Sequence, residues 1–116
     1  MSKKLNSTLV TIDAANIEGW TSFHAVFKNA LGFPEYYGAN MDAWNDCMTC
    51  VDDPQAAMTG VHAPEGGVLI IQLKNAKAFK TRCQEIYDAL IECSAFVNFR
   101  RIEKGEAPVL MLSFYD

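Results

Sequence analysis

Three short apolar runs, separated by stretches with helical spacing, constrain the fold of this chain more than any other feature. The runs cover residues 9–12 (LVTI), 68–73 (VLIIQL) and 109–114 (VLMLSF). Each is too short for a core helix and is bounded by turn-forming residues, which indicates a strand. The second and third runs are apolar at nearly every position. This pattern favours strands that are covered on both faces, as in a parallel sheet.

Helical patterns fill the gaps between the runs. The first helix is expected to begin near Trp20 and to end at Gly32 and Pro34. A second helix is expected to begin after Asn40 as its N-cap and to continue to about Cys50. Further along, apolar residues recur at spacings of 4, 3, 4, 3 and 4, which predicts either one long helix or a short helix followed by a long one. These residues are Phe79, Cys83, Ile86, Leu90, Cys93 and Val97.

The predicted order is strand, two helices, strand, one or two helices, strand. This order predicts an α/β fold with a three-stranded, largely parallel sheet packed against three or four helices. A chain of 116 residues supports a single domain, residues 1–116. Residues 1–6 contain two lysines but lead into no apolar stretch of secretory-signal length, and no run approaches the roughly 18 residues that cross a bilayer. We therefore expect a cytoplasmic protein with reduced cysteines and no membrane contact.

The charge of the chain is unevenly distributed. Residues 29–73 contain no Lys or Arg but six acidic residues, so this segment carries a charge of −6, whereas the rest has ten basic residues against eight acids. An acidic surface repels nucleic acid and speeds encounters with cationic partners. Direct binding of RNA or DNA is therefore disfavoured. The six acids are Glu35, Asp42, Asp46, Asp52, Asp53 and Glu65.

The second predicted helix has a polar face that includes two carboxylates. At 100° per residue, a sector of about a quarter turn contains Asp42, Asn45, Asp46 and Thr49. Asp42 can interact with the helix dipole, whereas Asp46 lies a full turn further in and its spacing to Asp42 is mildly unfavourable. No Lys or Arg lies nearby in the sequence, so the two carboxylates are predicted to bind a cation of a partner molecule. A simple solvated acidic face remains the alternative. The opposite, core-facing side contains Met41, Trp44, Met48 and Val51.

Two tyrosines directly precede this helix. Tyr36 and Tyr37 lie in a loop that is rich in Pro and Gly. Tyrosine is enriched at protein interfaces because it combines a flat apolar ring with a polar tip. We expect one of the two to point outward and the other to pack inward.

The loop and helix together resemble the signature of the barstar family of ribonuclease inhibitors. The matching residues are Pro34, Glu35, Tyr36, Tyr37, Gly38, Asn40, Asp42, Ala43, Asp46 and Cys47. The resemblance implies a barstar-like fold whose loop and second helix plug the active site of a ribonuclease. In that family the inhibitor's carboxylates stand in for RNA phosphates against the cations of the enzyme.

The resemblance also implies roles for single residues. Asp46 matches the family's dominant acidic anchor, Asp42 its neighbour one turn earlier, and Tyr36 a loop aromatic that packs on the enzyme. Asn40 and Thr49 match polar contacts at the two ends of the helix, while Asp52 and Asp53 are expected at the rim. The complete set of expected partner-binding residues is Tyr36, Tyr37, Gly38, Asn40, Asp42, Asn45, Asp46 and Thr49.

The chain also departs from the family pattern. Asn45 stands where the best-known member has a tryptophan, and Ala39 replaces a charged residue. Trp44 lies one position before Asn45, on the core face. The family has a further acidic contact on its last helix, for which Glu92 is the candidate here.

Two other kinds of site are possible but disfavoured. Cys47 and Cys50 have the C-x-x-C spacing of dithiol redox sites, but such sites place the first cysteine at a helix N-terminus, where its thiolate is stabilised. Here Cys47 follows the predicted N-cap by seven residues and adjoins Asp46. A zinc site that includes His62 lacks a second compact ligand pair. His24 is expected to be structural and His62 to be exposed.

The sequence therefore predicts a non-enzymatic inhibitor of a basic ribonuclease that is monomeric when free and needs no metal or cofactor. Two alternatives remain open. The first is a non-inhibitory protein-binding module of the same fold, and the second is a thiol redox protein that uses Cys47 and Cys50.

Overall fold

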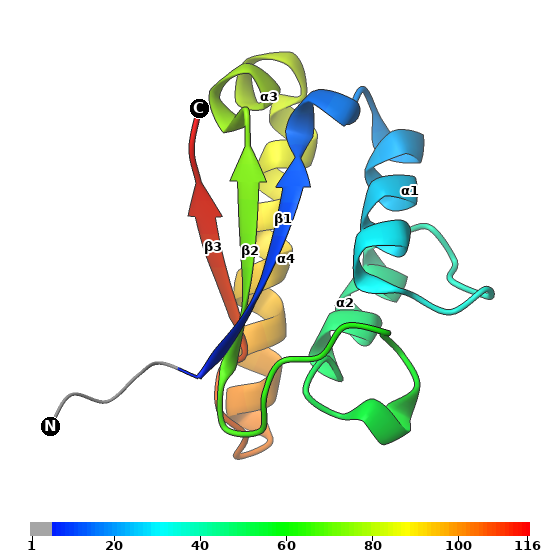
Figure 1. Ribbon diagram of the computed structural model, residues 1–116, viewed down its shortest axis with the longest axis vertical. Coiled ribbons are helices and arrows are strands. Elements are labelled where there is room, and N and C mark those ends of the chain that lie inside the picture. The colour runs from blue at the N-terminus through cyan, green and yellow to red at the C-terminus, as the bar shows by residue number, and fades with distance from the viewer. Residues whose placement is uncertain (1–5) are drawn as a thin grey trace, which may run out of the picture.

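The computed structural model describes residues 6–116, so the expectations about residues 1–5 lie outside the described part of the chain. The elements follow one another in the predicted order (Figure 1). The strands are β1 (Ser7–Asp13), β2 (Val68–Lys74) and β3 (Leu110–Phe114). The helices are α1 (Trp20–Leu31), α2 (Met41–Thr49), α3 (Ala76–Arg82) and α4 (Gln84–Glu103), with short 3-10 helices η1 (Ala14–Asn16) and η2 (Pro54–Ala56). The predicted α/β fold is confirmed.

The three strands form one parallel sheet in the order β1-β2-β3. Val10 of β1 is in register with Ile71 of β2, which in turn is in register with Leu112 of β3. Both crossovers therefore step in the same direction across the sheet. Because such connections are right-handed, they place their helices on the same face.

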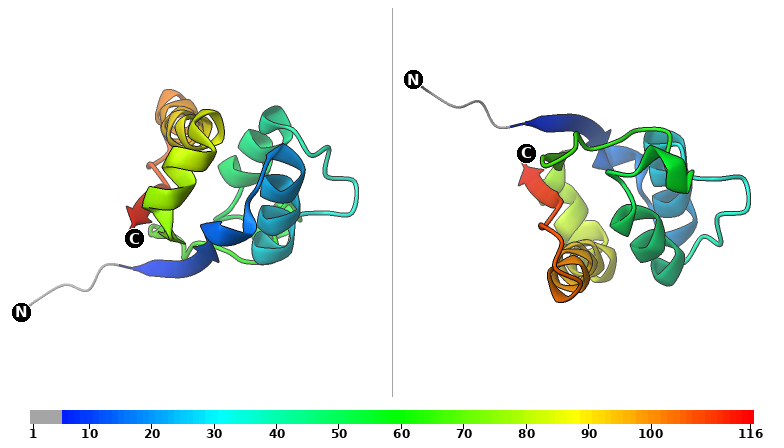
Figure 2. Two further views of the ribbon diagram at one scale, coloured as in Figure 1. Left: turned by 90° about the horizontal axis from the view of Figure 1, so that it is seen from above. Right: turned by 90° about the horizontal axis from the view of Figure 1, so that it is seen from below.

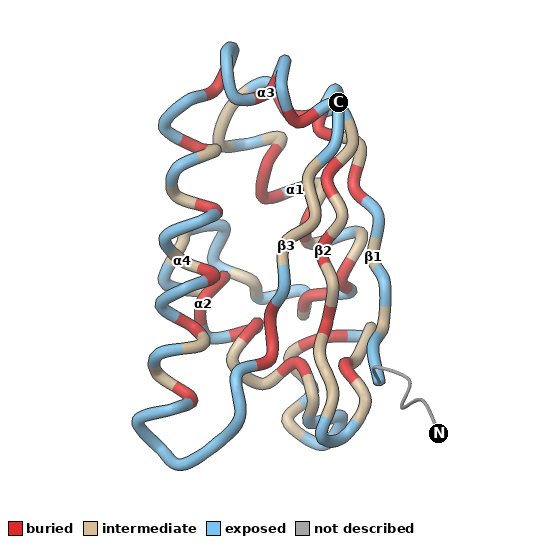
Figure 3. Tube along the Cα trace, turned by 90° about the vertical axis from the view of Figure 1, so that its left-hand side faces the viewer, coloured by how far each residue is buried: buried red, intermediate tan, exposed pale blue. Residues whose placement is uncertain are grey.

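The prediction that the second and third strands are covered on both faces is wrong. The helices lie on one side of the sheet, as the views along it show (Figures 2 and 3). Along β2 the buried residues alternate with half-buried ones. On the uncovered face Leu9 is 56% exposed and Met111 45% exposed. Ile70 lies between them in register. The name "open sheet face" is used below for Leu9, Ile70 and Met111.

The helix boundaries follow from local signals. α1 ends at Gly32, which adopts a left-handed conformation (φ 68°) and donates its N–H to the carbonyl of Lys28. α2 begins after Asn40, whose Oδ1 accepts a hydrogen bond of 2.8 Å from the N–H of Ala43. The long apolar stripe is divided at Cys83 into a short and a long helix.

The core lies between the covered face of the sheet and the helices. α2 contributes the fully buried Trp44 and Met48 to it, and Val51 follows them into the core. Trp44 packs edge-on against Phe27 of α1, with 5.8 Å between the ring centres. Met41, at the start of α2, is half-buried. Because this side of α2 faces inward, its acidic residues are turned outward.

Candidate protein-binding site

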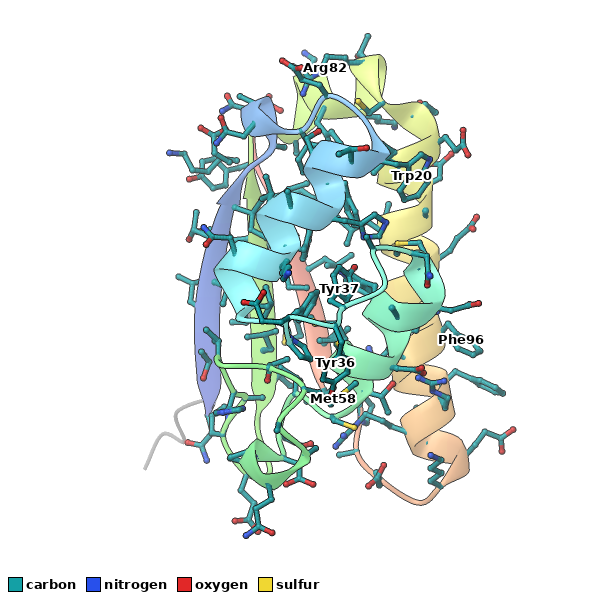
Figure 4. The ribbon with its side chains drawn as sticks, turned by 90° about the vertical axis from the view of Figure 1, so that its right-hand side faces the viewer. Trp20, Tyr36, Tyr37, Met58, Arg82 and Phe96 are labelled. Carbon is teal, nitrogen blue, oxygen red and sulfur yellow. The ribbon has the colours of Figure 1, made fainter. Side chains whose placement is uncertain are left out.

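The two tyrosines of the loop have opposite orientations, as predicted (Figure 4). Tyr36 is 75% exposed, and its hydroxyl donates a long hydrogen bond of 3.7 Å to Sδ of Met58. Tyr37 is half-buried, and its hydroxyl lies 2.6 Å from Nδ1 of His24. Its ring also packs on Phe33, with 4.7 Å between centres. Tyr37 therefore anchors the loop from within, while Tyr36 presents its ring to solvent.

His24 is part of this anchor. It is only 5% exposed, and burial lowers the pKa of its imidazole, which favours the neutral form. A neutral imidazole can exchange one hydrogen bond with a tyrosine hydroxyl. The expectation that His24 is structural is confirmed.

The loop reaches α2 through Gly38, Ala39 and Asn40, all of which are exposed. Ala39 has a left-handed backbone (φ 53°), which is strained for a residue with a Cβ atom. A Cβ atom on Gly38 would lie 3.3 Å from Nδ2 of Asn40, closer than most side-chain contacts. A glycine at this position therefore lets the loop pass close over the N-terminus of α2.

The outward side of α2 exposes Asp42 and Asp46, while Thr49 is half-buried. Asn45 was expected on the same face, but the structure buries it to 8% exposure. The reason is the position of α4, which packs against α2 along this flank. Asn45 lies beside Cys93 of α4, and its Oδ1 has no hydrogen-bond partner among residues 6–116. In this structure Asn45 belongs to the α2–α4 contact and is not displayed to a partner.

Asp46 has an internal partner, which corrects the expectation that no cation is available to it. Nη2 of Arg100, on α4, lies 3.1 Å from Oδ1 of Asp46 and donates a hydrogen bond of 2.7 Å to Oγ1 of Thr49. The Asp46 side chain nevertheless remains 62% exposed. Arg100 lies 54 residues further along the chain, so sequence proximity gave no sign of it. One carboxylate oxygen of Asp46 is thus engaged, and most of the group faces solvent.

Asp52 and Asp53, which are expected at the rim of the binding face, both make polar contacts within the chain. Asp52 forms a bidentate ion pair with Arg101, with N–O distances of 3.0 and 2.8 Å, and the Arg101 side chain is only 7% exposed. Asp53 caps η2 by accepting a hydrogen bond of 3.0 Å from the N–H of Gln55. Glu65 of the same acidic segment is exposed and has no polar side-chain partner in the described part of the chain.

Glu92 belongs to α4 and directly precedes Cys93, which lies beside Asn45 of α2. It is exposed, and it acts together with Asp42 to raise the pKa of the Cys93 thiol, although burial is the largest cause of that rise. Two carboxylates from different helices therefore converge near Cys93. This placement keeps Glu92 as the candidate for the family's acidic contact from the last helix.

A shallow groove of about 290 Å³ lies at the surface between α2 and α4. It begins at Asp46 and continues past Cys50 to the half-buried Met58, against which Tyr36 lies. Sequence reasoning identified the α2 wall of this groove but missed the α4 wall. The lining residues are Asp46, Thr49, Cys50, Met58, Arg100 and Lys104.

The cysteine pair lacks the environment of a redox site. Cys47 is buried within α2, and burial, together with the charge of Asp46, raises the pKa of its thiol to about 11. Burial also raises the pKa of Cys50. A reactive dithiol needs a lowered pKa, because the thiolate is the nucleophile. The structure therefore weakens the redox alternative.

The candidate metal ligands do not form a binding site either. His62 is half-buried, contrary to the expectation that it is exposed, and its Nδ1 lies 3.2 Å from the hydroxyl of Thr59. Within residues 6–116, no group of three or more His, Cys, Asp or Glu side chains is placed to hold a metal ion. No helix in the same range is both long and apolar enough to span a membrane.

Comparison with known proteins identifies a family and a relative. The family model described as "Barstar (barnase inhibitor)" matches residues 7–111, which include β1, β2, all four α-helices and the first two residues of β3. A protein of Bacillus subtilis (strain 168) named "Putative ribonuclease inhibitor YrdF" is 42% identical over 40 residues. That alignment covers 34% of this chain and 44% of the Bacillus protein, which is less than half of the length of that relative.

Proposed function

The chain belongs to the barstar family, and on that basis we propose that it binds a basic ribonuclease and blocks the active site of that enzyme. It would act in the cytoplasm and catalyse nothing itself. The binding face would consist of the loop from Tyr36 to Asn40 and the outward side of α2. The ribonuclease inhibitor name of the Bacillus relative is consistent with this role.

The observation that carries the proposal is the grouping of Asp42, Asp46 and Tyr36. Both carboxylates are exposed on one side of α2, and the exposed Tyr36 contacts Met58, which lines the same groove as Asp46. A ribonuclease must hold cations in its active site in order to bind the phosphates of RNA. Carboxylates inserted there would form charge-assisted hydrogen bonds with those cations. The exposed tyrosine would add apolar contact area at little entropic cost.

The anchoring of the loop by Tyr37 supports the same assignment. Tyr37 and His24 hold the loop against α1, and Gly38 lets it approach α2 closely. The binding face would thus be formed before the partner arrives. A preformed face loses less conformational entropy on binding, which favours affinity.

Titration of barnase with three inhibitor variants tests the proposal, because the family description names that enzyme as a target. The three proteins are the wild type, Asp46→Ala and the matched control Glu65→Ala. Asp46→Ala should weaken inhibition by about a hundredfold or more, because cations of the enzyme would be buried without a partner. Glu65→Ala removes the same charge outside the proposed face. It should change the affinity by less than about threefold and mainly slow association.

Both variants should be compared at low and high salt, with urea unfolding as a check that each is folded. Asp46 is mostly solvated, so its replacement should leave the fold intact. If Asp46→Ala inhibits as well as the wild type, or if Glu65→Ala is the more damaged variant, the proposed binding face is wrong.

A further inference from the structure

We propose that Arg100 is a specificity-determining residue that limits which ribonucleases the binding face accepts. It does so by occupying Asp46 and Thr49, two groups that the face would otherwise offer to a cation of the partner. This inference rests on the proposed function and concerns the selectivity of the same face.

The contacts of the guanidinium group show that both polar groups are engaged. A single nitrogen, Nη2, donates to Oδ1 of Asp46 at 3.1 Å and to Oγ1 of Thr49 at 2.7 Å. The hydroxyl of Thr49 already donates to the carbonyl of Asn45 at 2.6 Å, so Thr49 can offer a newcomer only acceptor capacity, which it shares with Arg100. A cation of a partner that approached Asp46 or Thr49 would therefore lie close to the guanidinium group of Arg100.

Arg100 is held in place and does not lie loosely in solvent. Its side chain is 29% exposed, and its guanidinium carbon lies 5.3 Å from the centre of the Phe96 ring, within the range of a cation–π interaction. Its Nε is buried and has no hydrogen-bond partner in the described chain. The guanidinium group has therefore lost one hydrogen bond to water, and its contacts with Asp46, Thr49 and Phe96 hold it in this position.

Lys104 extends the same basic edge. It lies one helical turn after Arg100 and lines the groove opposite Asp46. The groove is therefore divided, with Asp46 on the α2 side and the two cations on the α4 side. A ribonuclease whose contact surface carries only cations would oppose like charges at this edge, which is costly in a desolvated interface. A ribonuclease that places a carboxylate next to Arg100 and Lys104 would bind. The specificity would thus come from the repulsion between these two cations and the cations of other ribonucleases.

Barnase is the probe for this inference, and the variants are Arg100→Ala and Arg100→Gln. Arg100→Gln keeps part of the aliphatic stem of the side chain, so it shows whether the alanine variant is affected by a loss of packing. The control is Lys77→Ala, which changes the net charge equally and lies exposed on α3. Both Arg100 variants should bind barnase about tenfold more tightly than the wild type. Lys77→Ala should stay within about threefold of the wild type.

A double-mutant cycle distinguishes competition for Asp46 from a general effect of charge. The loss caused by Asp46→Ala should be several-fold larger in the Arg100→Ala background than in the wild type, because Asp46 is then fully available to the enzyme. If the Arg100 variants bind no better than Lys77→Ala while the wild type inhibits barnase, the inference is overturned and the proposed function stands. If none of these proteins inhibits barnase, the inference is overturned together with the proposed function.

Discussion

Tyr36 and Tyr37 are neighbours in the chain, yet the structure gives them separate tasks. Tyr37→Phe removes the hydroxyl that hydrogen-bonds the buried His24. The free energy of unfolding should fall by about 1 kcal/mol, because the imidazole, which is 5% exposed, loses its hydrogen bond to the tyrosine hydroxyl. Tyr36→Ala removes an exposed ring and should change the free energy of unfolding by less than about 0.5 kcal/mol.

Urea unfolding and inhibition of barnase, measured on both variants, separate the two tasks. Tyr36→Ala should be the variant that loses inhibition at unchanged stability. A Tyr36→Ala protein that is destabilised but fully inhibitory would show that the two residues have been assigned the wrong way round.

At Cys47 the raised thiol pKa gives a prediction about reactivity. With a pKa of about 11 against an ordinary 9.0, the thiolate fraction near neutral pH is about a hundredfold smaller than that of an ordinary thiol. Alkylation by iodoacetamide, followed by mass spectrometry, should therefore be slow at pH 8 and should accelerate as the pH rises towards 11. Rapid labelling of Cys47 at pH 8, or reversible cycling of Cys47 and Cys50 with thioredoxin, would restore the redox alternative.

Some of the candidate residues could be placed from the sequence, whereas their partners could not. The outward position of Asp42 and Asp46 and the inward position of Trp44 follow from helical periodicity, which is local. The ion pairs of Asp46 with Arg100 and of Asp52 with Arg101 join positions about 50 residues apart. They depend on the contact between α2 and α4, which no local pattern encodes. The burial of Asn45 has the same origin.

At the scale of elements, the segment after α2 is fixed to α4 by the partly buried ion pair of Asp52 with Arg101. Arg101 also donates hydrogen bonds to the carbonyls of Thr49 and Ala107, at 2.8 Å each. Asp52→Ala would leave the charge of Arg101 buried without its carboxylate, so the free energy of unfolding should fall by about 3 kcal/mol. Urea unfolding measures this loss, and Asp53→Ala is a suitable neighbour for comparison because Asp53 only caps a 3-10 turn. Equal stability of the two variants would contradict a structural role for Asp52.

The elements themselves were largely predictable. The strands and helices lie where the apolar patterns and the capping residues Asn40 and Gly32 indicated. The apolar stripe left one long helix and a short helix followed by a long one equally open, because it keeps its phase through the break at Cys83. The uncovered side of the sheet was missed because apolar residues such as Leu9, Ile70 and Met111 were interpreted as buried, although they face outward.

At the scale of the whole molecule, two surfaces are candidates for contact with a partner. The first is the acidic binding face of the loop and α2, and the second is the open sheet face formed by Leu9, Ile70 and Met111. They belong to different layers, because α2 lies on the covered side of the sheet (Figure 2). A partner that docks on one would leave the other free, so the surface that responds to a ribonuclease identifies the binding face.

The most direct test of the central claim is a map of backbone amide chemical shifts of this protein during titration with barnase. The largest changes should occur from Tyr36 to Thr49, with smaller ones around Arg100, whereas the signals of Leu9, Ile70 and Met111 should not change. The same titration with a short RNA in place of the enzyme should produce no changes in this segment, because an acidic face repels phosphates. Changes concentrated on the open sheet face, or a response to RNA at α2, would contradict the account.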